Sequence, residues 1–229
     1  MRASWLRTSS ILTMRVCQKK IESYLSQMEG SRLIVPFMGT SSEVLLATKT
    51  RRFEFIWVND PNPSIAALWR SIGVYPRKLT RKIEKYLAAE YDVAYFSAEL
   101  SNLKRIPADV EEVTDIALKR LTIMKDGQVW NPVQLSRYIR SANTLLKKQS
   151  CRFTSWDFET LFNDRTENDI VYVETPTLPT ADLWRLSESL HSIPNWLFIT
   201  TDNEHVRRFF PWANIEETRS QLILTPSQY

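Results

Sequence analysis

Short apolar runs alternate along the chain with longer segments of helical spacing, and this alternation limits most strongly what the chain can fold into. The runs are rich in Ile, Val, Phe or Trp and lie at Arg32–Phe37, Phe53–Val58, Ile170–Val173 and Trp196–Thr200. Helical spacing is found at Ile21–Met28, Ser42–Lys49, Ser64–Ile72, Leu79–Glu90, Asp109–Leu121, Val133–Lys148 and Ala181–Ser192. Strands that alternate with helices are typical of parallel βαβ units. The sequence therefore predicts a doubly wound α/β sheet.

Size and composition favour one folded domain, with or without an insertion. Of the 229 residues, 43% are hydrophobic, which is enough to bury a full core. The apolar run around Ile11 is too short for a signal peptide and no window can span a bilayer, so we expect a cytoplasmic protein whose residues 1–13 form a disordered extension. Cys17 and Cys151 lie far apart without metal-ligand spacing, so we expect neither a disulfide nor a metal.

A glycine and an acid stand where a nucleoside-binding unit needs them. Gly39 follows the first apolar run directly, where a tight turn lets the backbone approach a ligand. Asp60 follows the second run about twenty residues later, where an acid can accept hydrogen bonds from ribose hydroxyls. One glycine is not a fingerprint, however, and Asp60-Pro61 is also an ordinary turn sequence.

Several motifs, read in order, carry a more specific signal. They are CQKKIESYL, LIVPFMGTSSEVLL, WVNDPNPSIAALWRSI, KDGQVWNP, SCRFTSWDFETLF, DIVYVETPTLP and WLFITTDNEHVRRFFPWANIEE. In this order they resemble the motifs of Dam-type DNA adenine methyltransferases. The resemblance implies a Rossmann-like S-adenosylmethionine-dependent methyltransferase fold with a helical DNA-recognition insertion. It also implies S-adenosylmethionine as the cofactor and duplex DNA as the partner.

The resemblance implies cofactor-binding roles for residues that follow the first strands, namely Pro36, Phe37, Gly39, Asp60, Asp157 and Phe158. In this reading Asp60 binds the ribose, and Asp157 with Phe158 holds the adenine. Because parallel strands end at one edge of a sheet, we expect Gly39, Asp60 and Asp157 to form one pocket. Ordinary roles stay open: Asp157 also suits a helix cap, and both phenylalanines suit a core.

The segment expected to act on the target base departs from the family pattern. Where the family has Asp-Pro-Pro-Tyr, this chain has Glu174-Thr175-Pro176-Thr177, so the candidate catalytic residues are Glu174, Pro176 and Thr177. Glu174 keeps a carboxylate with one more methylene, and Thr177 has no ring to stack on a flipped adenine. Ser41 replaces the second glycine of the cofactor turn, and the loop after Pro179 is short.

Residues 73–150 are interpreted as a helical target-recognition insertion between the two parts of the catalytic domain, 14–72 and 151–229. The net charge of +4 and pI near 9.1 permit a polyanionic partner without requiring one. Candidate DNA contacts within the insertion are Arg77, Lys78, Arg81 and Lys125. A basic run of this kind is also compatible with a solvated helix face.

Three functions are compatible with these features. The first is methyl transfer from S-adenosylmethionine to the exocyclic amino group of adenine in DNA, as in restriction–modification. The second is a catalytically degraded homologue that binds DNA or a protein partner without methyl transfer. The third is an enzyme that keeps the cofactor site and uses another acceptor. We expect a monomer in each case.

Overall fold

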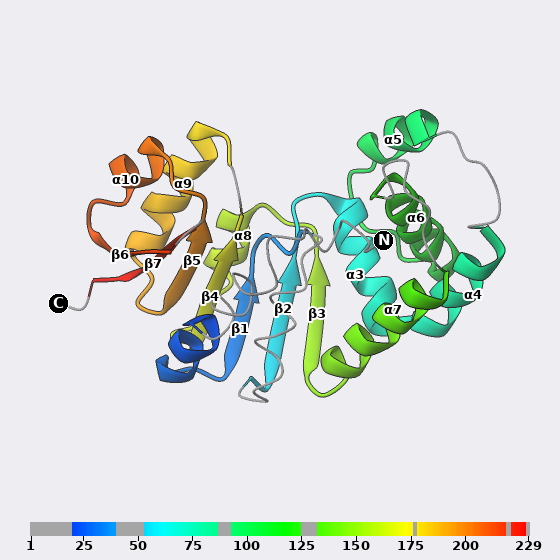
Figure 1. Cartoon of the computed structure of the whole chain (residues 1–229), viewed down its shortest axis with the longest axis horizontal. Helices are drawn as coiled ribbons and strands as arrows, with labels where there is room; N and C mark the ends of the chain where they lie inside the picture. Colours follow the sequence, from blue (N-terminus) through cyan, green and yellow to red (C-terminus); the bar gives the residue numbers. More distant parts are fainter. Residues whose placement is uncertain are drawn as a thin grey trace.

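A seven-stranded sheet forms the centre of the part of the chain that the computed structural model describes, which is residues 20–39, 53–86, 93–124, 132–175, 178–218 and 221–227 (Figure 1). The strands are β1 (Arg32–Val35), β2 (Phe55–Asn59), β3 (Ser150–Thr154), β4 (Asp169–Glu174), β5 (Trp196–Thr200), β6 (Ala213–Glu217) and β7 (Leu222–Pro226). Their order is β3-β2-β1-β4-β5-β7-β6. Strands β1 to β5 pair in parallel, whereas β7 is antiparallel to β5 and β6. This is a Rossmann-like, doubly wound arrangement, and the predicted α/β fold class is confirmed.

Helices join the strands of the parallel part of the sheet. They are α3 (Pro63–Val74), α4 (Pro76–Tyr86), α5 (Val93–Ser101), α6 (Val110–Met124), α7 (Pro132–Leu146), α8 (Phe158–Asn163), α9 (Thr180–His191) and α10 (Glu204–Phe209), and residues 20–27 are also helical. The four apolar runs form β1, β2, β4 and β5, as predicted. Helix α5 was not predicted, and the helix expected at Ser42–Lys49 lies outside the described residues.

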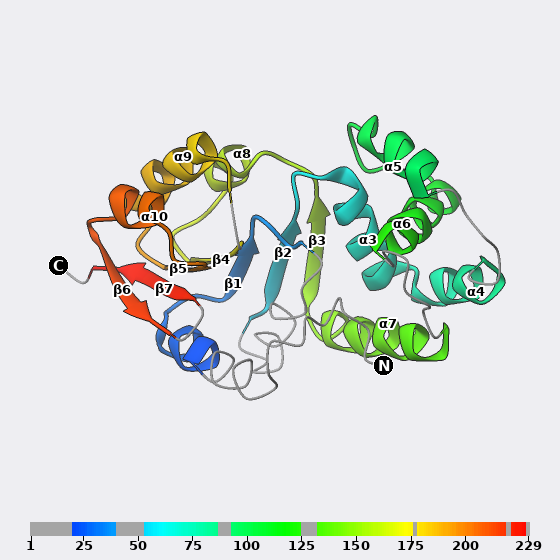
Figure 2. The same cartoon turned by 45° about the horizontal axis from the view of Figure 1, so that its top comes forward.

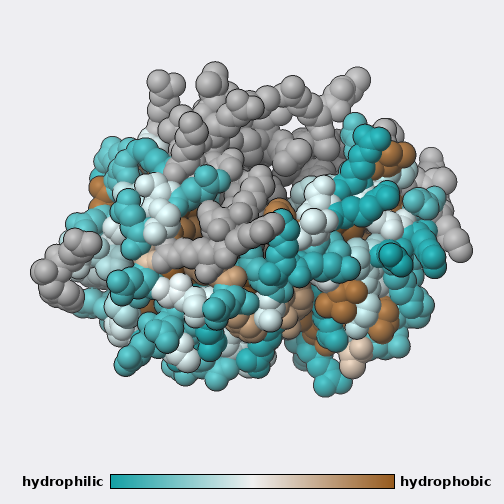
Figure 3. Space-filling model, turned by 90° about the horizontal axis from the view of Figure 1, so that it is seen from below, coloured by the Kyte–Doolittle hydropathy of each residue, from teal (hydrophilic) through white to brown (hydrophobic). Residues whose placement is uncertain are grey.

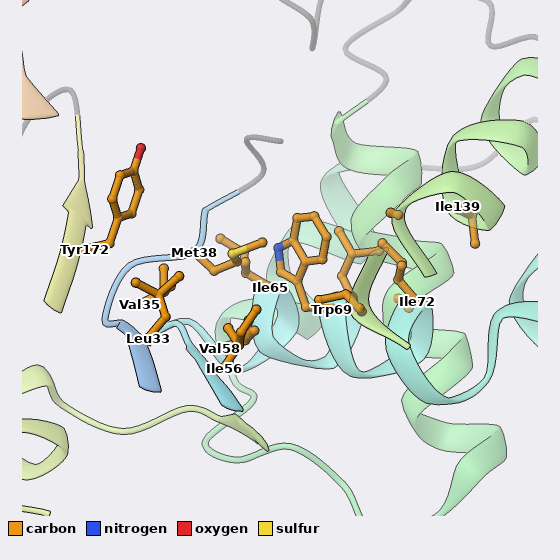
Figure 4. Close-up of a cluster of buried hydrophobic side chains, with 14 of the residues drawn as sticks. Leu33, Val35, Met38, Ile56, Val58, Ile65, Trp69, Ile72, Ile139 and Tyr172 are labelled. Atoms are coloured by element: carbon orange, nitrogen blue, oxygen red, sulfur yellow. The ribbon is translucent and has the colours of Figure 1, made fainter. Parts of the chain in front are cut away.

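Alternate residues of β1 point to opposite faces of the sheet and so separate two hydrophobic clusters. Leu33 and Val35 belong to the cluster covered by α3, α6, α7 and the helix at 20–27 (Figure 4). Ile34 belongs to the cluster covered by α8, α9 and α10. Both faces are buried, and for this reason the strands read as continuous apolar runs without polar alternation.

The helical insertion between β2 and β3 shares the core of the sheet. Leu79 of α4, Leu118 of α6 and Ile139 of α7 belong to the same buried cluster as the strand residues. Asn143 of α7 donates hydrogen bonds to the backbone carbonyls of Ile72 and Gly73. Figures 1 and 2 show these helices beside α3 and the β3 edge of the sheet. The insertion is therefore packed against the sheet as part of one hydrophobic core.

Figure 3, which views the molecule from below, shows a mainly hydrophilic face with small hydrophobic patches. None of the helices in the described ranges is long and apolar enough to cross a membrane. Among the same residues, no group of three or more His, Cys, Asp or Glu side chains could hold a metal ion.

Candidate functional site

The candidate site lies at the carboxyl edge of the sheet, where β1 to β4 end side by side (Figure 2). In open α/β sheets, ligands bind at this edge. The residues that follow the four strands are Gly39 after β1, Asp60 after β2, Asp157 after β3 and Glu174 at the end of β4. Their contacts decide which of them can act together.

The turn after β1 is built around Gly39. Its φ of +55° lies in the left-handed region, where side chains are strained. Its N–H donates to Oδ2 of Asp60 at 2.8 Å, and its carbonyl accepts from the indole N–H of Trp69 at 2.8 Å. A Cβ placed on Gly39 would meet no described atom within 4 Å, so backbone conformation and not crowding favours glycine here.

Asp60 is a buried carboxylate, only 6% exposed. Its Oδ2 accepts from Gly39, and its Oδ1 accepts from the N–H of Asn62 at 2.9 Å. Burial raises the pKa of Asp60 from 3.8 to about 6, although the two backbone hydrogen bonds and the charge of Arg120 oppose this rise. Each oxygen that accepts one N–H keeps a lone pair for a further donor.

Asn59 joins the ends of three strands, and the sequence analysis did not identify this role. The side chain is fully buried. Its Nδ2 donates to the carbonyls of Pro36 at 2.9 Å and Trp156 at 3.0 Å. Its Oδ1 accepts from the Thr154 hydroxyl at 2.7 Å and the Trp156 N–H at 2.8 Å. An amide as the last residue of an apolar strand was the signal that could have revealed it.

Phe37 and Phe158 lie against each other. Their ring centroids are 5.5 Å apart, and Phe158 is 2% exposed. Both pack with the cluster under α8 and α9. The guanidinium of Arg185 lies 4.8 Å above the Phe158 ring. Phe158 is therefore a core residue, and Phe37, which is only partly buried, lies against it after β1.

Asp157 is held in a different way from Asp60. Its carboxylate caps α8 by accepting the N–H of Glu159 at 3.0 Å, and it pairs with Arg185 of α9 at 2.9 Å. Arg185 also pairs with Glu159 and Asp182. This places the charged partner of Asp157 over one face of the sheet, whereas Arg120 of α6, which acts on Asp60, belongs to a helix over the other face. The structure joins Gly39 to Asp60, and the contacts of Asp157 lead to α9 instead.

Glu174 provides a carboxylate at the end of β4. The side chain is partly buried, and its Oε2 accepts a hydrogen bond from the Tyr172 hydroxyl at 2.8 Å. The next residue, Thr175, is buried. Pro176 and Thr177, the other two candidate catalytic residues, lie outside the described residues, and α9 begins at Thr180.

The candidate DNA contacts lie on α4, except for Lys125, which is outside the described residues. Arg77 and Arg81 are exposed. Lys78 forms an ion pair with Glu111 of α6, which lowers the pKa of that carboxyl. Arg77 and Arg81 are therefore better placed than Lys78 to meet a phosphate.

Comparison with known proteins adds little to this geometry. No protein-family model matches the chain, and no curated protein matches it. Among solved structures, it is similar to the rRNA methyltransferase aviRa from Streptomyces viridochromogenes, with a TM-score of 0.48 and 13% sequence identity. The superposition covers 98% of this chain and 92% of that chain. Similarity at this level identifies neither a family nor a ligand.

Proposed function

We propose that this protein is an S-adenosylmethionine-dependent methyltransferase whose acceptor is the exocyclic amino group of adenine in duplex DNA. The observation that carries the proposal is the hydrogen bond from the Gly39 N–H to the buried Asp60 carboxylate. It joins the glycine turn after β1 to the acid after β2, the two positions at which doubly wound folds bind the ribose of a nucleoside.

The residues at this position fit an adenosine group. Asp60 is an acceptor with lone pairs left for ribose hydroxyls, and Gly39 brings backbone close without a side chain. Phe37, which is only partly buried, offers an apolar surface on which an adenine ring can pack. S-adenosylmethionine, when bound, supplies the electrophilic methyl group.

On the acceptor side, Glu174 is the residue that would hold the adenine amino group. Its carboxylate can accept an N–H of that group and thereby orient the nitrogen toward the methyl donor. The hydrogen bond from Tyr172 restricts the direction of the longer Glu side chain. Such restriction matters because about 1 Å of misplacement can slow a reaction on the order of 100-fold.

DNA binding would begin with phosphate contacts from α4. Arg77 and Arg81 are exposed, and contacts to phosphate position a protein without reading sequence. We expect the logarithm of the affinity for duplex DNA to fall linearly with the logarithm of the salt concentration. The slope should be about −0.9 for each phosphate contacted. Charge reversal at Arg77 and Arg81 should flatten that slope, whereas an unchanged slope would make this run a solvated helix face.

A second candidate is a homologue that binds cofactor or DNA and transfers no methyl group. The ion pair between Asp157 and Arg185 favours it, because Asp157 would have to leave Arg185 to hold an adenine. The altered segment at Glu174 to Thr177 also favours it, because no ring is available there to stack on the target base.

Two measurements test the proposal and separate the candidates. Calorimetry should show binding of S-adenosylmethionine that Asp60→Ala weakens by about 10- to 100-fold, as expected for hydrogen bonds to a charged group. Asp164→Ala is the matched control, because Asp164 is an exposed aspartate paired with Arg152. Absence of binding by the wild type would overturn the cofactor assignment.

The second measurement is transfer of labelled methyl from S-adenosylmethionine to mixed-sequence duplex DNA. Glu174→Ala should abolish transfer and leave cofactor affinity unchanged, because Glu174 would act on the acceptor. Thr177→Tyr should raise transfer if base stacking limits the rate. If the wild type binds S-adenosylmethionine and DNA, but neither the wild type nor Thr177→Tyr transfers methyl, the second candidate is established.

A further inference from the structure

Helix α7 and the two residues after it carry positive charge that no acid nearby in the sequence balances. Residues 127–156 contain no Asp or Glu, and they include the cations Arg137, Arg140, Lys147 and Lys148. All four side chains are exposed. Within the described ranges, none of the four forms an ion pair. Their charges are therefore available to a partner of opposite charge.

The four cations lie on the side of α7 opposite its buried side. The buried residues repeat at helical spacing, and they are Leu135, Ser136, Ile139, Ala142, Asn143 and Leu146. At about 100° of rotation per residue, the four cations fall on the other side of the helix and form one exposed row, the α7 stripe. The N–H of Lys147 donates to the Asn143 carbonyl at 2.9 Å, so the helical course continues past Leu146. At about 1.5 Å per residue, the stripe spans about 16 Å.

The α7 stripe stands on a support that the core holds in place. On the buried side of α7, Asn143 donates to the carbonyls of Ile72 and Gly73 at 2.9 and 2.8 Å. Helix α4, which exposes Arg77 and Arg81, packs beside α7 (Figures 1 and 2). Two lysines of α4 are already paired with acids of α6. The α7 stripe therefore adds unpaired charge next to a helix whose own charge is partly neutralised.

We propose that the α7 stripe is a second phosphate-binding surface, which holds the backbone of duplex DNA through its four cations. The inference rests on the proposed function, since it assigns further contacts to the same DNA partner. Phosphates of one DNA strand repeat about every 3.4 Å along the duplex axis, so a stripe of about 16 Å can face about five of them. A cation that neutralises a phosphate releases a condensed counterion, and this release favours binding. Cations without a carboxylate partner do so without first breaking an ion pair.

An anionic lipid surface is a poorer partner for the α7 stripe. Basic helices that bind membranes place an apolar side in the lipid. The apolar side of α7 is instead buried in the core, where Leu135, Ile139 and Leu146 pack with the strand residues. On the exposed side of α7, Val133 is the one large apolar side chain. The stripe can therefore attract an anionic partner by charge, but it offers no apolar side to insert into lipid.

The test measures binding of a mixed-sequence DNA duplex at several salt concentrations. The double variant Arg137→Gln/Arg140→Gln should bind about 10- to 100-fold more weakly at about 0.1 M salt, with a log–log slope shallower by about 1.8. Lys147→Gln/Lys148→Gln provides an independent pair with the same expected effect. The matched control is Lys20→Gln/Arg207→Gln, which removes the same charge from cations paired with Glu216 and Glu217 beside β6, at the other end of the sheet (Figure 1). The control should leave the slope unchanged.

The outcomes separate this inference from the proposed function. A wild type that binds no duplex would overturn both. Wild-type slopes in both α7 variants would overturn the role of the α7 stripe alone. An equal loss in the control variant would also overturn it, since net charge would then set the affinity. The same holds if the α7 variants lose binding to phosphatidylserine vesicles and keep binding to DNA, because the stripe would then face a membrane. Thermal unfolding controls for misfolding, because all four substituted side chains are exposed and the melting temperature should stay nearly constant.

Discussion

Asp60 and Asp157 follow two neighbouring parallel strands and lie at the same edge of the sheet, yet their side chains are held by different kinds of contact. Asp60 is buried and accepts two backbone N–H groups. Asp157 is exposed and makes an ion pair with the long side chain of Arg185. A backbone donor in a buried turn cannot move without the chain, whereas an exposed ion pair opens easily.

The difference indicates which half of the edge is preorganised. The end of β2 is fixed by Asn59 and Asp60 through short, buried hydrogen bonds. The Asp157 side chain beyond β3 relies on an ion pair that water and salt can replace, although Thr154 and Trp156 before it bond to Asn59. The predictions below test this contrast, in order of decreasing expected effect.

The largest effect is expected for Asn59→Ala. The change leaves buried donors and acceptors of Pro36, Thr154 and Trp156 without partners, each at a cost of about 1–3 kcal/mol. We expect the free energy of unfolding to fall by about 3–5 kcal/mol in urea denaturation. Asn214→Ala, which removes one exposed bond to Pro226, should change it by less than about 0.5 kcal/mol. Equal losses of unfolding free energy in Asn59→Ala and Asn214→Ala would contradict the claim that Asn59 fixes the end of β2.

The next effect concerns pH and Asp60. Its pKa in the folded protein, about 6, lies above the ordinary 3.8, so the folded state holds this proton more tightly. The associated stability is complete below the ordinary value and is lost as pH rises through about 6. Relative to Asp60→Asn, the wild type should be less stable at pH 7 than at pH 4 by about 2–3 kcal/mol. Unfolding free energies at the two pH values measure this.

The exposed Asp164 provides the control for the pH experiment. Asp164→Asn makes the same substitution at an exposed carboxyl and is measured beside Asp60→Asn. A wild type whose stability rises between pH 4 and 7 relative to Asp60→Asn would show that Asp60 is ionised more easily than its burial implies.

The smallest effect on stability is expected for Arg185→Met. Its carboxylate partners Asp157, Glu159 and Asp182 are 46%, 44% and 38% exposed, so water screens these pairs, and we expect the melting temperature to shift by at most about 2 °C and the shift to shrink in high salt. The same change removes the ion-pair partner of Asp157. A higher affinity of Arg185→Met for S-adenosylmethionine would then show that Asp157 binds the cofactor. Arg165→Met, which removes one exposed bond to Ser192, is the control. A large loss of stability would show that the contacts of Asp157 are as firmly held as those of Asp60.

The sequence alone determined much of the parallel sheet, because buried parallel strands must be apolar along their whole length. The runs at Arg32–Phe37, Phe53–Val58, Ile170–Val173 and Trp196–Thr200 became β1, β2, β4 and β5. Strand β3 escaped strand prediction because it lies at the edge of the sheet, where Ser150 and Arg152 are exposed. An exposed edge does not require an apolar sequence.

Only the tertiary structure decided how the candidate residues are used. Sequence spacing placed Gly39, Asp60 and Asp157 at one edge, because parallel strands end together. It could not show that Asp60 bonds to Gly39 while Asp157 pairs with Arg185, since the partner is supplied by α9 from a distant part of the chain. Nor could it show that the charge of Arg120 acts on Asp60, because α6 packs on α3 only in the folded chain. Local patterns specify strands and turns, whereas the partner of a charged side chain is decided by which helix packs over it.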